Sequence, residues 1–411
     1  LWGGVQPEYG YQELCDNFNK EYADKGIQVE YTRYVNDDNG NLQLETYLMG
    51  GDQIDIYMCY GGKARLVTRQ EAGMTYDMTD YLKEHGFDPV EELGAASVVP
   101  YQIDGKYYCL PTKYENVNWW LCNADMFKEA GIELPLHGWT YAEFEEACKK
   151  LTHGEGQDKV YGMYWNLVKD FNGATNFMPQ MITDYGFYTD ATMTATNLND
   201  DVYKKGLQMM VDSFNEGWGT SYEQVVADGL TFDNTFLQGK AAISTTISNL
   251  RLVRDTATYP RDFETAIIPA PVPDESYMDN WDFSSVTGAG DQICVNPKSE
   301  HVEEAMEFVL WYIQGGMAPL AKGGRIPLWK GFDPNLVLNS LCEEPGVINE
   351  ESVRTYMSIG RNQGLESYTT SADAKIKAIR KEEMEAAFYG QKTVDQACED
   401  AKTRADELLK K

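Results

Sequence analysis

The sequence has no apolar run near the ~20 residues that a membrane-spanning helix needs. It is also poor in histidine, with four residues scattered along 411 positions. Its cysteines form no Cys-x-x-Cys pair and no Cys/His cluster, which are the usual signs of a structural zinc site. We therefore expect no metal and no cofactor. The composition, 43% hydrophobic and 24% charged, is typical of a globular chain.

Local catalytic signatures are missing too. The chain contains no Gly-x-Ser-x-Gly elbow, no His-Glu-x-x-His and no phosphate loop of the Gly-x-x-x-x-Gly-Lys type. Gly288-Ala289-Gly290 lacks the third glycine of a dinucleotide fingerprint. A glycosidase needs two carboxylates at a set separation, but among 65 acidic residues some pair is always close, so composition cannot indicate one. These absences favour a binding protein over an enzyme.

Basic residues are scarce relative to acidic ones. The 35 Lys and Arg against 65 Asp and Glu give a net charge of −30. Such a charge argues against nucleic acid and against an anionic membrane surface as partners, and it disfavours polyanionic ligands. Solubility is the simplest reason for it.

Seven of the eight cysteines occupy apolar positions. Strand-like runs contain Cys59, Cys109, Cys122 and Cys294, and helix-like faces contain Cys15, Cys148 and Cys398. Buried free thiols behave as small apolar groups in such places. We therefore predict no disulfides.

The first sixty residues alternate between strand and helix patterns. Strands are expected before Val5, over 27–34 and over 54–60, with helices over 11–22 and 43–49 and a polar turn over 36–41. This alternation is typical of a parallel sheet, in which ligands lie at the carboxyl ends of the strands, here near 2–8 and 57–62. With 411 residues, two or three domains are expected.

The segment 104–131 organises the rest of the chain. It predicts a strand over 106–110, a step at Pro111, a second strand over 117–122, and a helix capped by Asn123 and ended by Gly131. The polar residues between the strands indicate either a crossing between two bodies or an ordinary hairpin corner, because buried polar groups are costly unless each is hydrogen-bonded. A helix over 140–151 follows, with a capping box of Thr140 and Glu143.

Five motifs in this region occur in a characteristic order. They are Asp104-Gly105-Lys106-Tyr107-Tyr108, Leu110-Pro111, Asn123-Ala124-Asp125-Met126-Phe127, Ala130-Gly131 and Trp139-Thr140-Tyr141-Ala142-Glu143-Phe144. In this order they resemble the extracellular solute-binding proteins of ABC transporters, family 1, the maltose-binding type. The segment from Phe236 to Ile243 and the closing segment from Gly390 are similar to the same family.

The resemblance implies an α/β fold of the two-lobe periplasmic-binding-protein type (type II), with interleaved lobes and a ligand cleft at the hinge. We expect crossings near Pro111, Asp262 and Gly315. The N-terminal lobe would then comprise residues 1–110 and 263–313, and the C-terminal lobe residues 111–262 and 314–411. Three crossings at one waist would favour hinge closure over the ligand.

The resemblance also implies a set of binding residues. Glu115 matches an acidic ligand of the family, Tyr60 and Trp165 lie where aromatic rings stack on sugars, and Asp373 stands where some members have a stacking Trp. Leu250 replaces a Trp that is frequent in the family, which argues against a maltose-like stacking arrangement. Trp119 and Trp120 alternate in one strand, so one of them should face the core, as should Trp139 and Trp311. The remaining candidates are Gln6, Glu8, Asn116, Asn118, Asn166, Asn249, Trp281 and Arg325.

The function that follows is capture of a neutral carbohydrate, an oligosaccharide, and its delivery to the permease subunits of an ABC importer by a monomeric protein. Leu1 and Trp2 read as the interior of a strand without a preceding leader, so we expect a trimmed leader and an extracytoplasmic, lipid-anchored protein on a bacterial cell. The alternatives are a peptide or polyamine ligand on the same fold, a glycoside-processing enzyme, and a surface adhesin.

Overall fold

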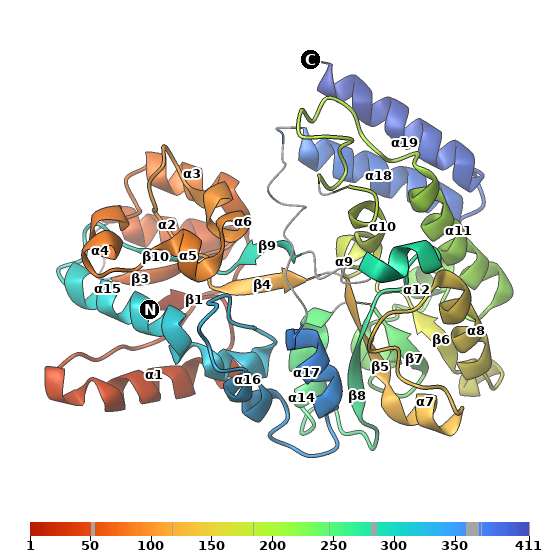
Figure 1. Cartoon of the computed structure of the whole chain (residues 1–411), viewed down its shortest axis with the longest axis horizontal. Helices are drawn as coiled ribbons and strands as arrows, with labels where there is room; N and C mark the ends of the chain where they lie inside the picture. The colour runs from red at the N-terminus through yellow and green to blue at the C-terminus, as the bar shows by residue number, and fades with distance from the viewer. Residues whose placement is uncertain are drawn as a thin grey trace. The chain divides into compact units, whose positions relative to one another are not determined.

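A computed structural model of the chain describes residues 1–50, 54–116, 118–183, 185–245, 247–280, 286–358, 370 and 372–410. The backbone divides into two compact units, whose elements are labelled in Figure 1. Unit 1 comprises Leu1–Glu115 and Gly288–Glu343, and unit 2 comprises Asn116–Thr287 and Glu344–Lys411. Each unit is thus built from two separate segments of the chain, as interleaved lobes require.

The borders between the units differ from the expected ones at two of three places. The first, after Glu115, lies close to Pro111. At Asp262 the chain stays in unit 2, because the next strand, β8 (Thr265–Pro269), pairs with β5 (Trp119–Asn123). At Gly315 it stays in unit 1, where the following turn of helix packs against the start of α1.

Unit 1 contains a four-stranded sheet in the order β10-β3-β1-β2. Strand β1 is parallel to both β2 and β3, while β10 is antiparallel to β3. The predicted parallel alternation of strands and helices is therefore confirmed. The strands are β1 (Trp2–Gly3), β2 (Thr32–Arg33), β3 (Ile56–Cys59) and β10 (Gln292–Val295).

Helices pack around this sheet and bury its apolar residues. The ring of Phe18 on α1, for example, meets Phe308 and Trp311 on α15 edge-on, with centroids 4.9 and 5.1 Å apart. The helices of unit 1 are η1 (Pro7–Tyr9), α1 (Tyr11–Glu21), η2 (Ala23–Lys25), α2 (Asp38–Gly50), α3 (Gly62–Glu71), α4 (Thr79–Glu84), α5 (Pro89–Leu93), α6 (Ala95–Val98), η3 (Val99–Tyr101), α15 (Val302–Trp311), η7 (Tyr312–Gly316), η8 (Ala318–Gly323) and α16 (Pro334–Leu341).

Three segments of unit 1 differ from the sequence prediction. The expected turn over 36–41 begins α2 instead, because the Asp37 carboxylate accepts the amide of Gly40 at 2.8 Å and its carbonyl accepts the amide of Asn41. The expected strand over 27–34 shortens to β2, since the side chain of Asn19 bonds both backbone groups of Val29 in place of a neighbouring strand. Residues 106–110 form only isolated bridges.

Unit 2 contains a second four-stranded sheet in the order β6-β7-β5-β8. Strands β6 and β7 are parallel, and β5 runs antiparallel to both β7 and β8. Trp119 and Trp120 are both buried, on opposite faces of β5, because this sheet is covered on both faces. The expectation that only one of them is buried was wrong. The remaining strands are β6 (Tyr161–Tyr164) and β7 (Ala241–Ser244), and β4 (Lys113–Asn116) pairs separately with β9 (Val286–Gly290).

The predicted caps of unit 2 are confirmed. The Asn123 side chain accepts the amide of Met126 at 3.0 Å, and Thr140 and Glu143 form the reciprocal capping box. Helices α18 and α19 pack along each other (Figure 1). The helices of unit 2 are α7 (Ala124–Glu129), α8 (Tyr141–Leu151), η4 (Gly156–Asp158), α9 (Phe171–Thr175), α10 (Phe177–Gln180), α11 (Asp201–Glu216), α12 (Tyr222–Ala227), α13 (Phe232–Thr235), η5 (Ile247–Asn249), α14 (Leu250–Arg254), η6 (Glu275–Asn280), α17 (Glu350–Ser358), α18 (Asp373–Phe388) and α19 (Val394–Leu409).

Candidate functional site

The carboxyl ends of β1 and β3 lie side by side in unit 1 and bring Tyr60 next to Gly4. The Tyr60 hydroxyl accepts the Gly4 amide at 3.0 Å. A Cβ on Gly4 would lie 3.1 Å from the Tyr60 ring, so glycine permits the close approach. Burial raises the pKa of Tyr60 well above its ordinary value, and its phenol therefore stays a neutral hydrogen-bonding group. Its ring is partly buried.

A buried ion pair lies close to the phenols of Tyr60 and Tyr31. The Arg325 Nε donates to Asp291 Oδ2 at 2.6 Å, and Lys113 Nζ lies 3.9 Å from Asp291 Oδ1. Burial alone would raise the pKa of Asp291, but the charges of Arg325 and Lys113 outweigh it and hold the pKa below its usual value. The charges of Asp291 and Arg325 also act on the pKa of Tyr60 and of Tyr31, which Asp291 raises and Arg325 lowers. We call Gly4, Tyr31, Tyr60, Asp291 and Arg325 the unit 1 strand-end cluster.

The loop after β1 contains Gln6 and Glu8, which lie beside this cluster in the sequence. Gln6 is partly buried and precedes η1, and its carbonyl accepts the amide of Tyr9 at 3.1 Å. Glu8 is exposed and lines a small hollow of about 460 Å³ together with Lys322. The binding role of both side chains stays a prediction.

Unit 2 gathers amides at the corresponding edge of its own sheet. Asn166 follows β6 and Asn249 follows β7, so the parallel pairing of these strands places both at one end of the sheet. Asn118 precedes β5, whose antiparallel course brings it to that same end. The backbone N–H of Asn166 donates to the Thr245 hydroxyl at 3.2 Å, which connects the two loops. These residues, Asn118, Asn166, Thr245 and Asn249, form the unit 2 strand-end cluster.

Asn249 carries an unsatisfied donor. Its side chain is 7% exposed, and its Nδ2 has no hydrogen-bond partner within the part of the chain that the structure describes. Leaving such a group buried and unpaired costs about 1–3 kcal/mol. An acceptor supplied by a ligand would remove this penalty.

Trp165 lies in the core and not at a surface where a sugar could stack. Its ring has no exposed area, its Nε1 donates to the Ser213 hydroxyl at 2.9 Å, and Trp120 meets it edge-on with centroids 5.7 Å apart. The helices that cover this face of the sheet account for its burial. The structure therefore places Trp165 among the packing residues of unit 2.

The other expected binding residues are distributed along the chain. Glu115 and Asn116 end β4, and their side chains are outside what the structure describes, as is Trp281 altogether. Asp373 begins α18, where its carboxylate accepts the hydroxyl of Tyr188 and the amide of Thr370, the latter at 2.8 Å. Those bonds give Asp373 a local structural role.

A family model described as bacterial extracellular solute-binding protein matches residues 3–314. The chain belongs to this family. The match covers most of unit 1 and the first segment of unit 2, which include the strand-end clusters of both units except Arg325.

Solved structures share the fold of this solute-binding protein over its whole length. A sugar transporter from Rhizobium etli in an open conformation is 20% identical, with a TM-score of 0.71 and coverage of 99% of this chain and 98% of that one. A substrate-binding protein from Listeria monocytogenes in complex with cycloalternan is 18% identical, with a TM-score of 0.66 and coverage of 100% and 98%. A cyclic alpha-maltosyl-1,6-maltose binding protein from Arthrobacter globiformis is 17% identical, with the same TM-score and coverage. At this identity the likeness establishes the two-lobe fold.

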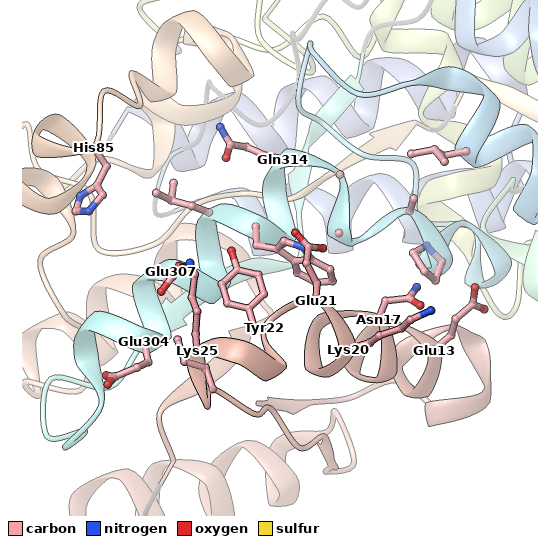
Figure 2. A pocket seen from close by; sticks show the side chains of 18 of the residues that line it. Glu13, Asn17, Lys20, Glu21, Tyr22, Lys25, His85, Glu304, Glu307 and Gln314 are labelled. Carbon is pink, nitrogen blue, oxygen red and sulfur yellow. Dashed lines mark hydrogen bonds and ion pairs between the residues drawn. The ribbon is translucent and has the colours of Figure 1, made fainter.

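Unit 1 also has a groove of about 1490 Å³ on its helical side, lined by residues of α1, α15 and α16. Figure 2 shows Lys25 beside Glu307, and these two form an ion pair. The Trp311 Nε1 donates to the Glu21 carboxylate at 2.8 Å. This indole was expected in the core, but it is only half-buried and lies at the rim of the groove. The groove is lined by helix residues and not by strand ends, so we separate it from the candidate site of this solute-binding protein.

Sequence reasoning missed the anchoring role of Asp291 and the contribution of Thr245. Asp291 has φ +51, a left-handed conformation, directly after Gly290. A Gly-Asp-Gln step could have marked a bend at a strand start, but Gly288-Ala289-Gly290 was considered only as a dinucleotide fingerprint. Thr245 gave no local signal.

The described residues contain no group of three or more His, Cys, Asp or Glu side chains that could hold a metal ion. In the same part of the chain, every helix is too short or too polar to cross a membrane. The unit 2 strand-end cluster offers neutral amides and hydroxyls, which can donate and accept hydrogen bonds. The unit 1 strand-end cluster contains the pair of Asp291 and Arg325, with Lys113 near the same carboxylate.

Proposed function

We propose that this solute-binding protein captures a neutral oligosaccharide outside the cytoplasm and delivers it to the permease subunits of an ABC importer, without chemically changing it. The family membership supports the solute-binding role. The choice of an oligosaccharide is supported by neighbours whose structures contain cycloalternan or mannotriose. A lipid anchor and a monomeric state belong to the same proposal.

The structural observation that carries the proposal is the buried Nδ2 of Asn249, which has no hydrogen-bond partner among the described residues. It lies in a cluster of amides and hydroxyls, which are the groups that bind sugar hydroxyls by donating and accepting at once. An anionic or cationic ligand would need a countercharge, and the residues of the unit 2 strand-end cluster carry none. This chemistry favours a neutral, hydroxyl-rich ligand over a polyamine.

We assign Glu115, Asn116, Asn118, Asn166 and Asn249 as hydrogen-bonding contacts and Tyr60 as an aromatic contact. Gln6, Glu8, Trp281, Arg325 and Asp373 stay as weaker candidates. Replacing Glu115 by Gln keeps the shape and removes a charge-assisted bond, so affinity should fall roughly ten- to a hundredfold. An exposed control, Glu350→Gln on α17, should leave affinity unchanged.

The first experiment is a thermal-shift screen with neutral oligosaccharides, peptides and polyamines, followed by calorimetry on the strongest ligand. A ligand at a hundred times its dissociation constant adds about 2.7 kcal/mol of stability. Chromatography of the incubated glycan checks that it is recovered unchanged. If a polyamine or a peptide stabilises the protein and no glycan does, the ligand class is refuted, and cleavage of the glycan would refute the non-enzymatic role.

The variant Asn249→Leu tests directly whether the Asn249 Nδ2 binds the ligand. If Nδ2 serves the ligand, the variant loses affinity while the ligand-free protein keeps or gains stability, because an unsatisfied donor has been removed. A purely structural Asn249 would show the reverse: lower stability and unchanged affinity.

A further inference from the structure

Three cysteines that are far apart in the sequence lie together in the core of unit 1. Cys294 is in β10, Cys59 in β3, and Cys109 in the segment before β4. All three are at most 2% exposed. They pack on one face of the unit 1 sheet, at the side of β10 and β3.

The backbone places Cys109 opposite Cys294. Leu110 and Ile293 exchange both of their hydrogen bonds, at 3.1 and 2.9 Å, which makes them a hydrogen-bonded antiparallel pair. The next residues outward, Cys109 and Cys294, then form a non-hydrogen-bonded pair, in which Cα atoms are about 4.5 Å apart and side chains are closest. Disulfides join Cα atoms about 4.4–6.8 Å apart.

Cys59 is the third member of the group but has a poorer position. On β3, Tyr57 is the residue opposite Cys294, and Cys59 is opposite Gln292. Cys59 therefore faces Cys294 only diagonally, and diagonal neighbours are about 7–8 Å apart. The geometry ranks Cys109 ahead of Cys59 as the partner of Cys294.

Both residues are free thiols in this structure. Against the sequence prediction of no disulfides, we propose that Cys109 and Cys294 form a disulfide when the chain folds under oxidising conditions. Each thiol loses its hydrogen, one S–S bond forms, and the two electrons and two protons reduce a disulfide oxidant, such as oxidised glutathione, to two thiols. The bond ties the segment that leads out of unit 1 before Glu115 to the segment that returns at Gly288. It fixes the two chain segments at the edge of the same sheet.

The folded protein protects these thiols. Burial, followed by the hydrogen bond with Cys109, raises the pKa of Cys294, although its contact with Cys59 lowers it in part. The hydrogen bond with Cys294 followed by burial raises the pKa of Cys59. Since the thiolate is the attacking species, oxidation proceeds before the sheet closes over these residues and is slow afterwards. Protein folded under reducing conditions keeps eight thiols, and protein folded in an oxidising compartment has six.

The experiment compares the full chain refolded with oxidised and reduced glutathione against the chain refolded with dithiothreitol. Each sample is denatured, alkylated without reductant and weighed by mass spectrometry, and a protease digest identifies any linked peptides. We expect six alkylated cysteines after oxidative refolding, eight after reductive refolding, and one peptide that joins Cys109 to Cys294. The linked form should also unfold at a midpoint higher by roughly 5–10 °C.

Two variants make the assignment specific. Cys59→Ser removes the neighbouring thiol and should still give the linked peptide, with five of its seven cysteines alkylated. Cys109→Ser should leave all seven cysteines open to alkylation. Eight alkylated cysteines in the oxidised parent, or a link that runs through Cys59, would overturn the proposal. None of these outcomes depends on which ligand the protein binds.

Discussion

Replacing Asp291 by Asn removes the charge of the buried pair and leaves the rest of the position almost intact. Asp291 is 7% exposed, and its Oδ2 accepts the Arg325 Nε at 2.6 Å. Its φ of +51 lies in the left-handed region, which Asn tolerates far better than Ala. Backbone strain therefore does not enter the comparison, and the carbonyl of residue 291 can still accept the Thr112 hydroxyl.

The expected loss of stability follows from the charge of Arg325, which remains buried after the substitution. Removing one partner of a buried ion pair costs about 3–5 kcal/mol, because the other charge is left uncompensated. Arg325 keeps a bond to the carbonyl of Gly323 at 3.3 Å, and the Asn oxygen can still accept from Nε. We therefore expect Asp291→Asn to lower the free energy of unfolding by about 3 kcal/mol, the lower end of that range.

Urea unfolding followed by tryptophan fluorescence measures this loss. The matched control is Asp77→Asn in the same unit, where Asp77 pairs with Lys106 at 2.7 Å but the side chains are 31% and 53% exposed. Solvent screening limits such a pair to about 1 kcal/mol or less. Both variants report on the same transition of unit 1, so their difference isolates burial. Equal losses for the two variants, or a loss below about 1 kcal/mol for Asp291→Asn, would refute the reasoning.

Three further predictions concern stability. Because folding lowers the pKa of Asp291, its contribution to the free energy of unfolding is present above the unfolded pKa of about 3.9 and is lost as pH falls through the folded value. The difference in stability between the parent and Asp291→Asn in urea titrations should therefore disappear in strong acid. A constant difference down to that pH would contradict the prediction. Trp165→Phe leaves the Ser213 hydroxyl without its indole donor and should cost roughly 1–3 kcal/mol in the same titrations, whereas no change would contradict its place in the core. Thr140→Ala removes half of the capping box and should cost about 1 kcal/mol, with Thr140→Ser as the variant that restores it.

The caps and the sheet pattern were predictable because they depend on short-range chemistry. Asn123 and Thr140 each bond an amide three residues away, so the signal and the structure occupy the same few positions. The alternation of strands and helices in the first sixty residues indicated a parallel sheet for the same reason. The start of α2 was missed because Asp37 caps a polar sequence that also reads as a turn.

The binding residues were only partly predictable. Asn118, Asn166 and Asn249 were recognised individually, while their common edge depends on the pairing of β5, β6 and β7 across more than a hundred residues. Trp165 shows the opposite case. A tryptophan after a strand can face solvent or the core, and only the helices packed over the sheet decide which.

The sequence by itself determined the family, the two-unit α/β architecture, the helix caps and the net charge of −30. The caps and the charge follow from local pattern and composition, and the two-unit architecture follows from the resemblance to the family. The tertiary structure alone decided that the carboxylate of Asp291 meets Arg325, that Cys109 lies opposite Cys294, and that β8 remains with unit 2. These depend on strand register, and register is fixed by which apolar faces must be buried together, a property of the folded sheet that no single segment carries.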